Sequence, residues 1–148
     1  MTAPQAQRNT PRTAGALIAG VLVGLVLTLG TDAILHATGV FPPYDQATPT
    51  ALLALATAYR FVYSIIGSYI AARLAPDRPM WHAMFLGWLG LVVSLIGTVV
   101  TWNRGPQFAA HWYPISLVVL ALPAAWIGGR LYTFRHRDWS ATGEFFAR

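Results

Sequence analysis

Four long apolar segments dominate the sequence, at residues about 14–38, 51–74, 80–102 and 112–132. Each is close to the roughly 20 residues that an α-helix needs to cross about 30 Å of hydrocarbon. None shows the alternation of apolar and polar residues that marks the strands of a membrane barrel. With 55% hydrophobic and 10% charged residues, the chain of 148 residues also has too little polar surface for a soluble domain. The sequence therefore predicts an all-α integral membrane protein, a bundle of four helices.

The polar residues outside these segments divide the chain into three parts. Residues 1–13 contain two prolines and are expected to form a disordered tail. Residues 14–134 are expected to form the transmembrane domain, and residues 135–148 a second, charged tail. The first apolar segment is longer than the core of a signal peptide, which has about 7–15 residues, and no clear cleavage site follows it. We therefore expect this segment to stay in the protein as a helix.

The basic residues indicate how the chain lies in the membrane. The net charge is +5 and all ten positive side chains are arginines, a composition that hints at a GC-rich bacterial genome. The arginines gather near both termini and beside the connection at 75–79, whereas the connection at 39–50 has none. Under the positive-inside rule, both termini are expected in the cytoplasm, with the protein in the bacterial inner membrane. This distribution favours membrane topology, not nucleic-acid binding, as the reason for the charge.

Small residues recur at helical spacing in the first three apolar segments. They are Gly20 and Gly24 in the first, Ser64 and Gly67 in the second, and Gly87, Gly90, Ser94 and Gly97 in the third. Such stripes let helix backbones approach closely, because helices in lipid associate through packing and hydrogen bonds. We favour packing within one bundle. An interface in a homo-oligomer or in a larger membrane complex is the alternative.

Two charged residues lie well inside the predicted spans. Asp32 and Arg60 each cost about 2.5–3.5 kcal/mol at the centre of a membrane helix, so each is expected to have a partner. At 1.5 Å per residue, Asp32 lies about 9 Å and Arg60 about 15 Å from the helix ends at residues 38 and 50. Side chains lean toward the N-terminus of their helix, so these two lean toward each other. We predict an ion pair between Asp32 and Arg60 that joins the first two helices.

Two further residues extend this polar cluster. His36 follows Asp32 by four residues, a spacing that suits a hydrogen bond between them. Because histidine titrates near neutrality, a proton relay or a metal ligand is the alternative to a structural role for His36. Tyr63 is expected near the level of Arg60. The cluster of Asp32, His36, Arg60 and Tyr63 would either fix the helix register, which we favour, or line a water-filled path for a ligand or protons.

No pattern typical of an enzyme or of a cofactor site stands out. The sequence lacks the H-E-x-x-H and G-x-S-x-G motifs, a phosphate-binding Gly-rich loop, and any cysteine. The four histidines do not fall at one depth in facing helices, as a bound haem would require, and their spacing does not suit zinc. We therefore predict no enzymatic activity, no metal and no cofactor.

Three stretches carry a resemblance to known proteins. They are GTDAILHATGVFPP at residues 30–43, AYRFVYSIIGSYIAARLAPDRPMWHA at residues 58–83, and the closing segment WYP…ALPAAWIGGR. In these stretches the chain resembles small four-span bacterial membrane proteins that are described only as hypothetical. The resemblance covers most of the chain outside its two tails. It implies the fold and the membrane setting, and it brings no assigned activity.

Two functions of different classes are compatible with these features. We favour a non-enzymatic accessory or scaffold subunit that acts by helix association within the lipid bilayer, because of the small-residue stripes and short loops. The alternative is a small oligomeric transporter or permease-like protein whose path is lined by Asp32, His36 and Arg60. A hydrated cavity that reaches this cluster would favour the transporter.

Overall fold

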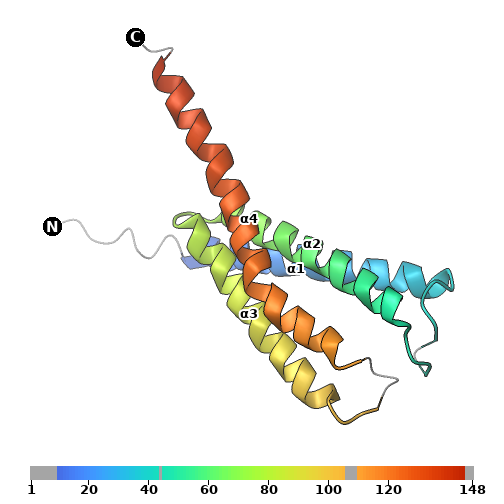
Figure 1. Cartoon of the computed structure of the whole chain (residues 1–148). Coiled ribbons are helices and arrows are strands. Elements are labelled where there is room, and N and C mark those ends of the chain that lie inside the picture. Colours follow the sequence, from blue (N-terminus) through green and yellow to red (C-terminus); the bar gives the residue numbers. More distant parts are fainter. Residues whose placement is uncertain (1–9, 44, 106–109, 146–148) are drawn as a thin grey trace.

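The chain folds into four long helices joined by short connections (Figure 1). This computed structural model describes residues 10–43, 45–105 and 110–145, with side chains as far as residue 135. The helices are α1 (Thr10–Ala37), α2 (Thr50–Leu74), α3 (Pro79–Thr101) and α4 (Trp112–Phe145). Each is long and apolar enough to cross a membrane, and the candidate span within α4 is Trp112–Arg135. The prediction of an all-α bundle of four membrane helices is confirmed.

The helix ends differ from the predicted ones mainly near the two chain termini. α1 begins at Thr10, and residues 1–9 lie outside the described part, so the disordered tail stays a prediction. α4 continues to Phe145, beyond the expected end at residue 132. Residues 133–142 contain neither glycine nor proline, so nothing in this stretch stops the helix. The extension projects past the other helices (Figure 1), and the division of the chain at residues 134 and 135 stays a prediction.

The connection after α1 has the geometry expected at a helix end. Gly39 has a φ of +72°, a left-handed conformation that glycine adopts without steric cost. The Phe41 N–H then donates to the carbonyl oxygen of Leu35 at 3.0 Å, which satisfies an acceptor in the last turn. The two prolines that follow, Pro42 and Pro43, prevent the helix from continuing.

The helices form two pairs that meet at one end of the bundle and separate toward the other (Figure 1). α1 packs along α2, α3 packs along α4, and α2 also contacts α4 closely, whereas α1 touches α3 only slightly. We call the end with the short α2–α3 turn the hairpin end. The loop end is the opposite end, which carries the connections at 38–49 and 102–111. The two pairs therefore enclose a wedge that widens toward the loop end.

Small residues allow the close approach of the helices toward the hairpin end. A Cβ atom placed on Gly20 would lie 2.7 Å from the carbonyl oxygen of Gly67, and one placed on Gly128 would lie 2.5 Å from that of Ile65. These contacts bring α1 and α4 against the backbone of α2. The alanines buried in the same region include Ala71, Ala72, Ala83, Ala124 and Ala125. Neither side of these contacts has room for a larger side chain.

The small-residue stripes lose their contacts toward the loop end. A Cβ atom on Gly24 would lie 3.7 Å from the carbonyl oxygen of Tyr63, and one on Gly90 would be 4.0 Å from its nearest neighbour. A Cβ atom on Gly97, one turn or more closer to the loop end, would meet nothing within 4 Å. The stripes thus pack at one end of the bundle and face open space at the other.

Candidate functional site

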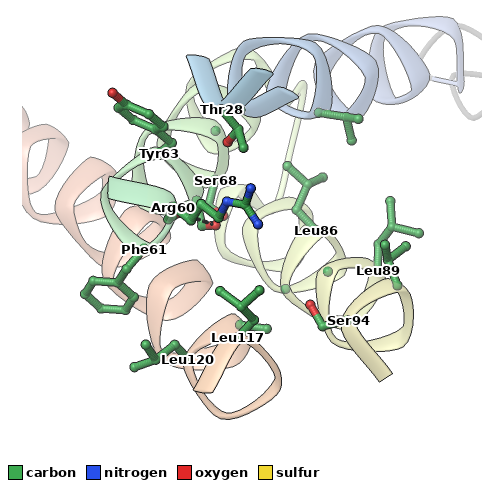
Figure 2. Close-up of a pocket in the computed structure, with 18 of the residues that line it drawn as sticks. Thr28, Arg60, Phe61, Tyr63, Ser68, Leu86, Leu89, Ser94, Leu117 and Leu120 are labelled. Atoms are coloured by element: carbon green, nitrogen blue, oxygen red, sulfur yellow. Dashed lines mark hydrogen bonds between the residues drawn. The ribbon is translucent and has the colours of Figure 1, made fainter. Parts of the chain in front are cut away.

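A pocket of about 380 Å³ occupies the wedge between the two helix pairs (Figure 2). All four helices contribute to its lining, which is mostly apolar. Its apolar side chains include Leu25, Leu86, Leu89, Val93, Leu117 and Leu120. Its polar side chains include Thr28, Thr57, Arg60, Tyr63, Ser64 and Ser94. The glycines of the small-residue stripes also line it, namely Gly20, Gly24, Gly67, Gly87 and Gly90. The pocket is thus an apolar space at membrane level with a few polar groups on its wall.

Arg60 is the one charged side chain among the described residues that line this pocket. It reaches from α2 into the space between α1 and α3 (Figure 2). Its Nη2 donates to Asp32 Oδ2 at 2.6 Å, and its Nη1 donates to the Tyr113 hydroxyl at 2.5 Å. Its Nε–H is buried and has no acceptor. The guanidinium is therefore held by α1 and α4, and Nε is its one nitrogen without an acceptor.

The structure contains the ion pair that the sequence predicts between Asp32 and Arg60. The other carboxylate oxygen, Oδ1, accepts a hydrogen bond from the Tyr59 hydroxyl. The side chains of Asp32 and Arg60 are 19% and 30% exposed, so both charges are largely removed from the surface of the protein. Each charge therefore depends on its partner for stabilisation in the bilayer.

Tyr59 and Tyr113 complete the cluster, and neither belongs to the set selected from the sequence. Tyr59 lies four residues before Tyr63 on one face of α2, with ring centroids 5.7 Å apart. Because residues four apart share a helix face, this spacing from Tyr63 could have identified Tyr59 as a member of the cluster. Tyr113 is 53 residues from Arg60 along the chain, and its ring centroid lies 5.7 Å from the Arg60 Cζ. No periodicity within one helix could have paired these two residues.

His36 and Tyr63 have different places relative to the pocket. His36 Nδ1 donates to the backbone carbonyl oxygen of Asp32 at 2.8 Å, and its ring packs edge-on against Phe41. His36 does not line the pocket, whereas Tyr63 does. The hydroxyls of Tyr63 and Thr31 share a hydrogen bond of 2.9 Å, which joins α1 and α2 beside the pocket. The structure thus brings Tyr63 and Arg60 to the pocket and leaves His36 at the end of α1.

The two serines selected for helix packing lie on the pocket wall. The Ser64 hydroxyl donates to the carbonyl oxygen of Arg60 at 2.8 Å, within α2, and Ser94 lines the pocket from α3. Across the described residues, there is no group of three or more histidine, aspartate or glutamate side chains that could hold a metal ion.

No family model matches this chain, and no solved structure matches it. A curated protein of Renibacterium salmoninarum, the fluoride-specific ion channel FluC, is 32% identical to it over 119 residues. The matched region covers 75% of this chain and 90% of that relative.

This relative corrects two expectations from the sequence. The resemblance to a group without an assigned activity was wrong, because the relative has a named activity. The preference for an accessory or scaffold subunit was wrong as well, because the relative is an ion channel, and the transport alternative is favoured instead. The preference failed because small-residue stripes and short loops are compatible with both a scaffold and a channel.

Other expectations agree with the comparison. An ion channel is not an enzyme, so the prediction of a non-enzymatic protein is confirmed. The protein is a multi-pass membrane protein with four spans, which sits in a lipid bilayer. With 32% identity over nine-tenths of the relative, the chain belongs to the family of the fluoride-specific ion channel FluC.

Proposed function

We propose that this chain forms a fluoride channel in a bacterial inner membrane and that the wedge pocket is part of its anion path. The observation that carries the proposal is Arg60, which places the positive charge of a guanidinium on the wall of a pocket at membrane level. An anion that enters the bilayer loses hydrogen bonds to water and needs donors in their place. The activity named for the relative from Renibacterium salmoninarum supports fluoride as the anion.

The remaining wall of the pocket suits a small anion. The hydroxyl-bearing residues Thr28, Ser64 and Ser94 lie around an otherwise apolar surface. A hydroxyl hydrogen can rotate toward a passing acceptor, so each of these groups can donate in turn. Conduction needs sites that bind an ion strongly enough to admit it and weakly enough to release it. Single hydroxyls spaced along apolar walls meet that requirement better than a second fixed cation would.

We also propose that two or more copies of the chain complete the path. α1 and α3 barely touch, so one chain leaves the wedge open to lipid on that side. A path for an ion must be closed to hydrocarbon, where an unsolvated charge is costly. A second copy packed across this opening would close it, and the exposed α3 residues Val93 and Val99 offer an apolar surface for the contact.

Fluoride efflux from liposomes tests the channel function. Purified protein in liposomes loaded with potassium fluoride is expected to release fluoride rapidly when a potassium ionophore is added. Liposomes loaded with potassium chloride are expected to release chloride far more slowly. Efflux no faster than from liposomes without protein, or equal rates for the two anions, would contradict the proposal.

We propose that both termini lie in the cytoplasm, as the arginine distribution indicates. A reporter enzyme that is active only in the periplasm is expected to give no signal when it is fused to either terminus. The same reporter placed in the connection at 39–50, which has no arginine, is expected to be active. Reporter activity at a terminus would overturn this orientation.

A further inference from the structure

The guanidinium of Arg60 has different neighbours on its two sides. Nη2 and Nη1 donate to Asp32 and Tyr113, and neither of these partners lines the pocket. Arg60 itself does line the pocket, and its buried Nε is the guanidinium nitrogen that has no acceptor. Arg60 therefore stands between Asp32 and the pocket. An anion in the pocket and the carboxylate of Asp32 would share one cation.

Asp32 is fixed in place to neutralise that cation. Oδ2 lies 2.6 Å from Arg60 Nη2, and Oδ1 accepts the hydrogen bond from Tyr59. A negative charge at this distance cancels much of the attraction that Arg60 would exert on a second anion. With Arg60 alone, the pocket would hold an anion tightly and release it slowly. Asp32 is placed to weaken this binding, as conduction requires.

We propose that Asp32 is a tethered counter-anion that competes with the permeant anion for Arg60 and thereby sets the affinity of the pocket. This inference rests on the proposed anion path, because it concerns the cation of that path. In this role Asp32 stays hydrogen-bonded to Tyr59. Its negative charge, on the side of the guanidinium away from the pocket, lowers the affinity of the pocket for the anion.

A purely structural ion pair makes a different prediction. If the pair served only to fix the register of α1 against α2, the loss of the carboxylate would destabilise the protein equally with and without added anion. A tethered counter-anion can be replaced in part by an anion from solution. The two roles are therefore separated by the dependence of stability on fluoride.

The variant Asp32→Asn tests the inference through fluoride-dependent stability. The thermal midpoint of purified protein is measured over a range of sodium fluoride concentrations, at constant ionic strength maintained with gluconate. Fluoride is expected to raise the midpoint temperature of unfolding in both proteins. The concentration that gives half of the maximal rise is expected to be on the order of tenfold lower in Asp32→Asn than in the natural protein. Because fluoride supplies the missing charge, it is also expected to restore folding if the variant is unstable without it.

Two control variants make the result specific. Asp32→Glu keeps the charge and is expected to respond to fluoride as the natural protein does. The double variant with Asp32→Asn and Arg60→Gln removes both charges and is expected to lose the fluoride-dependent rise. An equal response in all variants, or an Asp32→Asn protein that fluoride neither stabilises nor restores, would overturn the inference.

The outcome also separates this inference from the channel function. Tighter fluoride binding in Asp32→Asn, together with liposomes of the natural protein that release no fluoride, would contradict the channel and leave the counter-anion role in place. Rapid fluoride efflux by the natural protein, without tighter binding in the variant, would contradict the counter-anion role alone.

Discussion

Replacing Arg60 with glutamine is expected to abolish most fluoride efflux and to destabilise the protein. A hydrogen bond to a charged group contributes about 1.5–3 kcal/mol, so its loss lowers the affinity for the anion by about 10- to 150-fold. The substitution also leaves Asp32 without its partner, and an unpaired carboxylate in the membrane costs about 2.5–3.5 kcal/mol. Fluoride efflux from liposomes and the free energy of unfolding in mild detergent measure the two effects.

Two further variants separate the functional loss from the structural one. Adding Asp32→Asn to Arg60→Gln removes the unpaired charge and is expected to recover much of the stability without restoring efflux. Arg130→Gln is a matched control, because Arg130 is exposed on α4 and lies over the rings of Trp126 and Phe134, away from the pocket. It is expected to leave efflux unchanged. Normal efflux by a folded Arg60→Gln protein would contradict the role of Arg60.

Replacing Gly128 with alanine is expected to push α4 away from α2. The new Cβ atom would lie 2.5 Å from the Ile65 carbonyl oxygen and 2.9 Å from the Tyr69 backbone nitrogen. Both are backbone atoms and cannot move aside without displacing the helix. Overpacking of this kind costs about 1–3 kcal/mol, so the free energy of unfolding is expected to fall by that amount. Thermal unfolding in mild detergent measures the change.

Gly97→Ala is the matched control for this prediction. Nothing lies within 4 Å of the position that its Cβ atom would take, and alanine favours a helix by about 1 kcal/mol over glycine. The stability of Gly97→Ala in detergent is therefore expected to be unchanged or raised. If Gly128→Ala proved as stable as Gly97→Ala, the close contact between α4 and α2 would be contradicted.

The core of the polar cluster could be predicted from the sequence because its two charges are costly in lipid. The depths of Asp32 and Arg60 and the lean of their side chains indicate the pair without any knowledge of which helices are neighbours. The partnership of Arg60 with Tyr113 could not be predicted in this way, because it joins α2 to α4 across 53 residues. It depends on which helices are neighbours in the bundle.

The roles of the small-residue stripes were only half visible in the sequence. Their spacing indicated close helix contacts, and Gly20 and Gly67 make such a contact. The same spacing continues to Gly97, where the helices have separated. A stripe shows that one face of a helix carries small side chains. It does not show whether another helix packs against that face. The pocket exists because part of the stripes is left uncovered. The spacing of small residues therefore could not distinguish a scaffold from a channel.

By itself, the sequence determined that the chain forms four membrane helices, because hydrocarbon requires every backbone polar group to be satisfied within the segment. It also determined that Asp32 and Arg60 need partners, because neither charge is stable alone in lipid. Only the tertiary structure decided that Arg60 faces Asp32 on one side and the pocket on the other. That arrangement follows from the way the helix pairs cross and diverge. The crossing is set by contacts such as Gly128 against Ile65, between segments far apart in the chain, which no local period specifies.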